Sequence, residues 1–368
     1  MRAVLTVDLA AIAANWRELC ACHAGGAVAG VVKADAYGLG AAPVARALAT
    51  AGCRHFFVAS GAEGVAVRAA VGPGPMVAVL NGFAPGGGEE AAAGLVPVLS
   101  GLPDAEAHAA AARAAGGRRA PAILHLDTGM ARLGLDAREQ AALAEDPARL
   151  AGLELLFVMT HLACADEPAH PLNAAQAARF EAACARIAPG VPRSLANSSG
   201  IFLGPGFASD LARPGCALYG LNPTPGRPNP MRRPVRLEAP VLQVREISAG
   251  ATVGYGASWT APRDGTRIAT VAAGYADGYL RALSGRGAIG RVGGRAVPLV
   301  GRVSMDLLTF DATDLPEHAS APGAMVELIG PEEGTTPDCL AARAGTIGYE
   351  ILTALGARYR RDYVGGAA

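Results

Sequence analysis

The sequence has no excess of acidic or basic side chains and no long apolar run, and each absence excludes some kinds of protein. Its 368 residues include 32 basic and 32 acidic side chains, so the charge balance favours neither a nucleic-acid nor a membrane-surface partner. No window is long and apolar enough to span a bilayer. Asp8 interrupts the first apolar residues, and Arg17 and Glu18 follow it, which is untypical of a secretory signal peptide.

The seven cysteines also lack the paired spacing that structural metal sites require. No Cys-x-x-Cys pair occurs, and the Cys-Ala-Cys-His stretch at residues 20–23 has no second half, so we predict no metal site. An odd number of unpaired thiols is typical of a reducing compartment. We therefore expect a cytoplasmic protein.

What the sequence does contain is a repeated alternation of short apolar runs and alanine-rich helical stretches, from about residue 28 to residue 220. Near-continuous apolar strands that alternate with helices predict a parallel sheet with right-handed crossovers. Eight such units predict a closed (β/α)8 barrel of the TIM type. The eight runs span residues 28–34, 53–60, 75–81, 95–100, 122–129, 153–162, 191–198 and 210–220.

The pattern changes after the barrel. Residues 221–235 contain five prolines and little periodicity, which indicates a linker. Strand signals dominate beyond it, at 235–247, 266–276, 294–310 and 324–330, so the predicted fold class is an α/β barrel followed by a mainly β C-terminal domain. The predicted boundaries are a strand at 1–9 that pairs with the C-terminal domain, the barrel at 10–221, the linker at 222–234 and the β domain at 235–368.

Polar side chains fall at the ends of several predicted barrel strands, where barrel enzymes place their chemistry. Lys33 ends the first strand, His161 the sixth, and Arg213 lies near the end of the eighth. The loops after strands seven and eight, the usual phosphate cradle, offer the Ser198 hydroxyl and the amides of residues 215–216. A lysine that faces a phosphate cradle is suited to form a Schiff base with pyridoxal 5'-phosphate.

The fifth run adds three further polar residues, His125, Asp127 and Arg132. Asp127 has two interpretations, a catalytic acid or a residue that bonds the backbone of a strand-end turn. The stretch GRGAIG at 285–290 fits the dinucleotide fingerprint literally, but a strand rather than a helix is predicted after it, so the structural context is wrong for such a site.

Nine motifs, in order along nearly the whole chain, resemble those of bacterial alanine racemase, a family of pyridoxal-phosphate enzymes of fold type III. They are VVKADAYG, HLDTGMARLGL, THLACADE, LANSSG, RPGCALYG, VGYGASW, GYADGYLR, GRVSMD and IGYEILTALGARY. The combination of VKADAYG with GYADG and GRVSMD is highly specific.

The resemblance implies a role for each matching residue. Lys33 would hold the cofactor as an internal aldimine and act as one catalytic base, while Tyr255, supplied by the partner subunit of a homodimer, would act as the other. Arg213 would donate to the pyridine nitrogen, and His161 would lie beside the ring. The implied phosphate binders are Tyr37, Ser198, Gly215, Cys216 and Tyr349. The implied substrate contacts are Arg132, Met305 and Tyr275, and the implied access corridor includes Asp166, Tyr275, Arg281 and Arg302.

Two positions depart from the family pattern. Leu39 stands where the lysine motif usually has a histidine, beyond the residues that touch the cofactor. His125 stands where many members have a carbamylated lysine that braces the arginine equivalent to Arg132. An imidazole is not carbamylated in that way, so the sequence leaves open what braces Arg132 and whether an anion is bound there.

The implied activity is the interconversion of L-alanine and D-alanine by two-base proton transfer on the cofactor aldimine. One alternative is a basic amino-acid decarboxylase of the same architecture, against which GRVSMD and VGYG argue. The other is a non-catalytic pyridoxal-phosphate carrier, which would lack the β domain. The sequence does not distinguish a supply of D-alanine for peptidoglycan from alanine catabolism, and it does not fix the substrate range.

Overall fold

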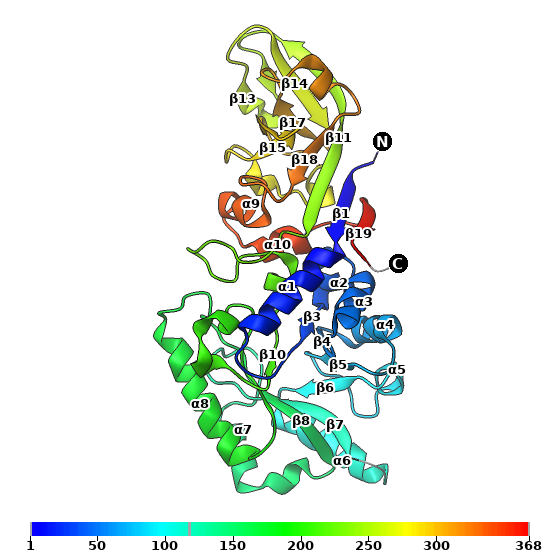
Figure 1. Ribbon diagram of the computed structural model, residues 1–368, viewed down its shortest axis with the longest axis vertical. Coiled ribbons are helices and arrows are strands. Elements are labelled where there is room, and N and C mark those ends of the chain that lie inside the picture. Colours follow the sequence, from blue (N-terminus) through cyan, green and yellow to red (C-terminus); the bar gives the residue numbers. More distant parts are fainter. Residues whose placement is uncertain (1, 117–118, 367–368) are drawn as a thin grey trace.

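The computed structural model describes residues 2–116 and 119–366. It has two parts stacked along the long axis of the molecule, a barrel of strands and helices and a β-rich part beside one end of it (Figure 1). One hydrophobic core runs through both, from Val31 and Phe57 in the barrel to Leu237 and Leu328 in the β-rich part. The predicted fold class, a (β/α)8 barrel followed by a mainly β domain, is confirmed.

Parallel strands form the barrel, as the apolar runs predict. Strands β3 to β9 are hydrogen-bonded in chain order, and β10 pairs with β2, which precedes β3. The ring closes between β9 and β10, where the Arg213 N–H donates to the Ala196 carbonyl at 2.8 Å and the Ser194 hydroxyl donates to the Leu211 carbonyl at 2.6 Å. The strands are β2 (Ala27–Val28), β3 (Gly30–Val31), β4 (His55–Val58), β5 (Met76–Val79), β6 (Val96–Leu99), β7 (Ala120–His125), β8 (Leu153–Met159), β9 (Arg193–Ser194) and β10 (Leu211–Ala212).

Helices alternate with these strands and pack around the barrel (Figure 1). Three of them, α1, α4 and α7, begin with the same capping arrangement. Before α1, the Asp8 carboxylate accepts the N–H of Ala11, the third helical residue, at 2.9 Å. Ser60 and Asp136 precede α4 and α7, and their side chains accept the N–H of the third helical residue, Glu63 at 3.4 Å and Glu139 at 2.8 Å. The helices are α1 (Leu9–Cys22), α2 (Lys33–Gly38), α3 (Ala41–Ala51), α4 (Gly61–Val71), α5 (Gly88–Ala92), α6 (Leu102–Ala114), α7 (Ala137–Glu145) and α8 (Pro171–Ile187).

Strand β11 is the longest strand of the β-rich part. It pairs antiparallel with β1, β18 and β14. Strand β1 also pairs in parallel with β19, so residues near both ends of the chain lie in one sheet beside the barrel (Figure 1). The elements are β1 (Val4–Asp8), β11 (Val235–Ile247), β12 (Thr252–Val253), β13 (Trp259–Thr260), β14 (Thr266–Val271), β15 (Ile289–Val292), β16 (Arg295–Pro298), β17 (Leu308–Asp311), β18 (Met325–Ile329), β19 (Arg360–Val364), α9 (Pro337–Ala344) and α10 (Gly348–Thr353).

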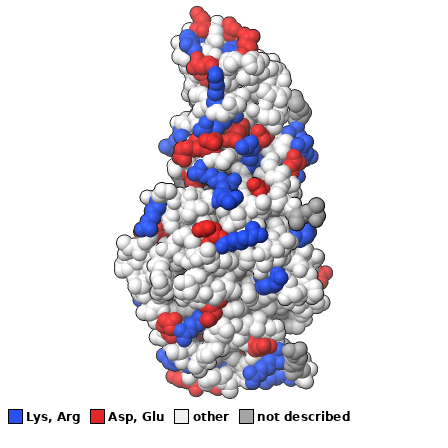
Figure 2. Space-filling view, viewed as in Figure 1, with Lys and Arg blue, Asp and Glu red and all other residues white. Residues whose placement is uncertain are grey.

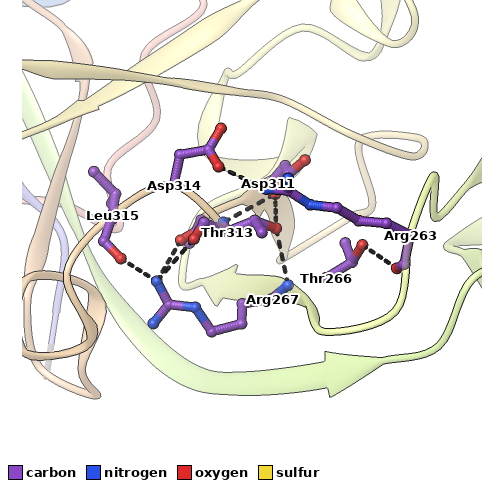
Figure 3. Close-up of polar contacts among 8 residues, drawn as sticks. Arg263, Thr266, Arg267, Asp311, Thr313, Asp314 and Leu315 are labelled. Carbon is purple, nitrogen blue, oxygen red and sulfur yellow. Dashed lines mark hydrogen bonds and ion pairs between the residues drawn. The ribbon is translucent and has the colours of Figure 1, made fainter.

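A polar network fixes the loop after β17 (Figure 3). The Arg267 guanidinium donates to the carbonyl of Thr313 at 3.2 Å and to that of Leu315. Arg263 forms an ion pair with Asp314 at 2.7 Å. The Arg267 hydrogen bonds satisfy backbone carbonyls of this loop, and the ion pair holds the Asp314 side chain. Strand β17 lies in the β-rich part, away from the barrel (Figure 1).

Acidic and basic side chains are interspersed on the face drawn in Figure 2, with large uncharged areas between them. Within residues 2–116 and 119–366, no helix combines the length and hydrophobicity needed to cross a membrane. Among the same residues, no group of three or more His, Cys, Asp or Glu side chains could hold a metal ion. All seven cysteines have free thiols. His23, in the Cys-Ala-Cys-His stretch, instead has its Nε2 at 2.9 Å from the Ser209 carbonyl.

Candidate active site

A cavity of about 540 Å³ opens at the carboxyl ends of the barrel strands. The loops after the strands carry the chemistry in barrels of this kind. Nine predicted site residues line the cavity together, namely Lys33, Tyr37, Arg132, His161, Ser198, Arg213, Gly215, Cys216 and Tyr349. The structure therefore brings the predicted cofactor residues into one place, although their roles remain predictions.

Lys33 and Tyr37 reach this cavity from a left-handed turn. Residues Ala34, Asp35, Ala36 and Tyr37, within α2, have φ between 52° and 57°. None of them is a glycine, and an L-residue in this conformation costs roughly 1–2 kcal/mol. The sequence predicted only that Lys33 ends the first strand, so this part of the prediction was incomplete. The turn places a lysine and a tyrosine on the same side of the chain.

The charge state of Lys33 is set by its surroundings. Burial lowers the pKa of the Lys33 amine, the positive charge of Arg132 lowers it further, and the Glu63 carboxylate raises it. A lowered pKa leaves more of the amine neutral and nucleophilic at a given pH. Lys33 is also the only lysine in the sequence, a signal that was present from the start and that the motif analysis did not use.

The loops after β9 and β10 form a small polar cradle. The Ser198 hydroxyl accepts the N–H of Gly215 at 2.9 Å and that of Ala217 at 3.3 Å. A Cβ at position 215 would come within 2.2 Å of the Tyr37 hydroxyl, so only glycine fits there without displacing Tyr37. The Tyr37 ring also lies 5.8 Å from the Tyr349 ring, measured between centroids. Hydroxyl and amide donors thus converge on one spot at the edge of the cavity.

Arg213 is the most buried charge of the site, with 4% of its surface exposed. Its guanidinium donates to the Ser194 hydroxyl and to the Thr160 carbonyl, both neutral partners. Burial lowers the pKa of Arg213 to about 10, so it still carries its charge at neutral pH. Burial and the charge of Arg213 lower the pKa of His161 to about 3, so this imidazole is neutral.

The cavity is cationic as a whole. Lys33, Arg132 and Arg213 line it, whereas none of its lining residues is acidic. Buried like charges repel one another unless an anion compensates them. The donor set, the cradle with no room for a Cβ and the single amine fit a phosphorylated aldehyde such as pyridoxal phosphate.

The predicted residues of the β-rich part form a second, separate cluster. Tyr255, Tyr275, Met305, Arg281 and Arg302 do not line the cavity. Their loops contact one another, because the Tyr275 N–H donates to the Ser304 carbonyl at 3.0 Å and a Cβ at Gly256 would come within 2.8 Å of Arg302 Nη1.

The side chains of this cluster are exposed, 69% for Tyr255, 53% for Met305 and 41% for Tyr275. Asp166, on the loop after β8, is also exposed and also lies outside the lining of the cavity. One chain therefore presents a lysine-bearing cavity and a tyrosine-bearing surface that do not meet.

Comparison with known proteins identifies the family. The model for the alanine racemase N-terminal domain matches residues 7–223, and that for the C-terminal domain matches residues 234–363. The chain belongs to the alanine racemase family. It is 55% identical to an alanine racemase of Rhodospirillum rubrum over 365 residues, 99% of this chain and 96% of the relative. It is 52% identical to a catabolic alanine racemase of Mesorhizobium japonicum over 366 residues, 99% of this chain and 94% of the relative.

Solved structures of alanine racemases have the same fold. The alanine racemase of Bartonella henselae, solved with covalently bound pyridoxal phosphate, matches with a TM-score of 0.92 at 41% identity and covers 99% of this chain and 100% of its own. The biosynthetic alanine racemase of Pseudomonas aeruginosa matches with a TM-score of 0.87 at 38% identity and covers 98% of this chain and 99% of its own. Both domains of the alanine racemase fold are therefore present.

His125, the position that departs from the family pattern, is buried and neutral. Burial, then the charge of Arg213, lowers the pKa of His125 to about 4. Its Nδ1 lies 3.3 Å from the Ser100 hydroxyl. A neutral imidazole offers Arg132 no opposite charge, so His125 does not form an ion pair with Arg132.

Of the two interpretations of Asp127, the structure supports the one in which it bonds the backbone of the strand-end turn. Its carboxylate accepts the N–H groups of Gly129 and Met130, both at 2.9 Å, and that of Ala131. These hydrogen bonds lower the pKa of the Asp127 carboxyl although its burial acts the other way. The residue closes the strand-end turn that carries Arg132, and the catalytic-acid interpretation has no support.

Sequence reasoning missed two asparagines that line the cavity. Asn81 follows β5 and Asn197 follows β9, next to Ser198. Their position at strand ends is the signal that could have found them, because the carboxyl ends of parallel barrel strands meet at one mouth. The Asn197 side chain accepts the Gly200 N–H at 2.9 Å, so it also shapes the loop after Ser198.

Proposed function

We propose that this protein interconverts L-alanine and D-alanine with pyridoxal 5'-phosphate bound in the barrel cavity. The observation that carries the proposal is the position of Lys33, the one amine in a cationic cavity without acidic lining residues. The cavity lies beside a cradle made by Ser198, Gly215 and Tyr37. Membership of the alanine racemase family supports alanine as the substrate.

The proposed roles follow from the chemistry of the side chains. Ser198, Tyr37, Tyr349 and the amides of Gly215 and Cys216 would hold the cofactor phosphate. Arg213 would bind the ring nitrogen of the cofactor through an N–H that it does not give up, and neutral His161 would contact the ring. When bound, the cofactor would supply an electron sink that acidifies the α-proton of the amino acid.

Racemisation requires a proton to leave one face of the α-carbon and another to arrive at the opposite face. Lys33 Nζ, with a pKa lowered by burial and by Arg132, takes or returns the proton on one face. The phenol of Tyr255 does the same on the other face. Arg132, Met305 and Tyr275 bind the substrate, and Asp166, Arg281 and Arg302 flank its access corridor.

Two copies of the chain complete one site in this proposal. The Tyr255 side chain is 69% exposed and absent from the cavity lining of its own chain, whereas Leu133, at the rim of the cavity, is 45% exposed. Large apolar side chains exposed on both surfaces are typical of an interface. A head-to-tail homodimer with two shared sites buries both surfaces and brings Tyr255 opposite Lys33.

The free thiols support a cytoplasmic location.

Incubation with L-alanine in D2O tests the activity. We expect optical rotation to fall toward zero while deuterium enters the α-position, and Lys33→Ala to abolish both changes. Release of CO2 from lysine or arginine would instead support a decarboxylase. Binding of the cofactor without turnover of any amino acid would support a carrier.

A further inference from the structure

The left-handed turn after Lys33 is held at its first residue by a carboxylate outside the cavity. Glu63 Oε1 accepts the N–H of Ala34 at 2.7 Å, and Glu63 Oε2 accepts the N–H of Ala59 at 2.8 Å. Ala34 is the first residue with positive φ, and Ala59 follows β4 directly. One carboxylate therefore ties the strained turn that carries Lys33 to the end of the neighbouring barrel strand.

Glu63 is itself firmly placed. It is the third residue of α4, its N–H donates to the Ser60 hydroxyl at 3.4 Å, and Val67 of the same helix is fully buried. The N-terminal turn of a helix favours a negative charge. The carboxylate thus reaches the turn from a fixed element and not from a mobile loop.

The same carboxylate acts on Lys33 through its charge. The groups that act on the amine are Arg132 from the loop after β7 and Glu63 from α4, and Lys33 in turn acts on His161. Arg132 lowers the pKa of Lys33, and Glu63 raises it. Glu63 does not itself line the cavity, so its negative charge acts on Lys33 from the far side of the turn.

We propose that Glu63 is a positioning residue for Lys33, which fixes the left-handed turn from which Lys33 and Tyr37 enter the same cavity. The effect on turnover rests on the function proposed above. Loss of either hydrogen bond lets the strained residues relax toward ordinary conformations, which moves the Lys33 amine away from the α-carbon.

Glu63→Gln is the first test. The amide keeps the length of the side chain but loses the charge, and it can accept an N–H at only one of its two ends. We expect kcat to fall about 10- to 100-fold, as misplacement of a catalytic group does. Because Lys33 is the only lysine, an amine-acetylating reagent on the cofactor-free protein modifies Lys33 and the chain's α-amino group, which peptide mass spectrometry separates. We expect the pH at which Lys33 becomes reactive to move down.

Glu139→Gln is the matched control. Glu139 is also the third residue of its helix, and its carboxylate also accepts two backbone N–H groups, from Leu102 at 2.9 Å and from Asp136 at 3.1 Å. It does not act on the Lys33 amine. This variant should lose comparable stability while its kcat stays within about twofold and its Lys33 titration stays unchanged.

Glu63→Asp separates the effect of the hydrogen bonds from the effect of the charge, because aspartate keeps the carboxylate charge on a shorter side chain. It should lower kcat while the Lys33 titration stays close to that of the parent, and it serves as the second variant if Glu63→Gln does not fold. A folded Glu63→Gln protein with parental kcat and a parental Lys33 titration overturns the proposal. If the parent shows no racemisation, the proposed function fails, but the acetylation experiment still decides whether Glu63 controls Lys33.

Discussion

The Tyr37 hydroxyl occupies the space that a side chain at position 215 would need. A Cβ built on Gly215 lies 2.2 Å from the hydroxyl oxygen and 3.0 Å from the ring carbon that bears it. The φ of Gly215 is −122°, so packing, rather than a left-handed backbone, requires glycine here. Tyr37 lies in the turn after β3 and Gly215 lies in the loop after β10, so this contact joins the two ends of the barrel sequence at the proposed phosphate cradle.

Gly215→Ala should therefore displace Tyr37 and weaken cofactor binding. Overpacking of this kind costs about 1–3 kcal/mol, and a loss of that size from cofactor binding would raise the Kd for pyridoxal phosphate about 5- to 150-fold. Fluorescence titration of the cofactor-free protein measures the change. Gly206→Ala is the control, because a Cβ there meets nothing within 4 Å. Equal affinity in the two variants would contradict the account of the cradle.

Arg213 should determine which reaction follows removal of the α-proton. Arginine keeps its proton, so a ring nitrogen that faces it stays unprotonated and withdraws electrons weakly. We expect Arg213→Glu, which can stabilise a protonated ring nitrogen, to lower racemisation and to raise the side reaction in which the amino group of alanine passes to the cofactor and pyruvate is released. Both products can be measured in one assay. Arg213→Gln, which adds no negative charge, should lose racemisation without a rise in pyruvate, and equal pyruvate from the two variants would refute this role.

The buried histidines should make the fold sensitive to mild acid. An unfolded histidine has a pKa of about 6.5, whereas burial lowers the pKa of His125 to about 4. Between these values the unfolded chain binds more protons than the folded chain, so the free energy of unfolding decreases as the pH falls through this window. Thermal unfolding of the cofactor-free protein from pH 7 to pH 4.5 measures the slope.

His125→Asn should flatten that slope, because one of the depressed titrations is removed. His318→Asn, at an exposed position, should leave it unchanged. A parental unfolding temperature that is constant over this range would show that neither buried imidazole resists protonation in the folded state.

Local sequence patterns predicted the architecture well and the conformation of the site only in part. Strand β11 coincides with the run at 235–247, and each of the eight predicted barrel runs overlaps a strand, because apolar periodicity reports burial directly. Strands β9 and β10 have only two residues each, far fewer than their runs, since the chain leaves the sheet there to form the Ser198 and Gly215 loops.

The left-handed turn at 34–37 could not be predicted from propensity. Its residues prefer other conformations, and the turn persists because distant groups hold it, Glu63 at its start and Arg361, which donates to the Gly38 carbonyl at 3.0 Å, at its end. The run at 266–276 likewise ends early, as β14, because the N–H of Tyr275 turns toward Ser304. Tertiary contacts of this kind cannot be predicted from a short stretch of sequence.

The central claim is that Lys33 of one chain and Tyr255 of another act on the same alanine. Unfolded Lys33→Ala chains and Tyr255→Phe chains, mixed and refolded together, test it most directly. In a mixed dimer with shared sites, one site carries both defects and the other carries none, so we predict that racemase activity returns, to about a quarter of the parental value if chains pair at random. If each chain builds its own site, every site carries a defect. Mixed dimers that form, as shown by differently tagged chains, and yet remain as inactive as the two parents would contradict the claim.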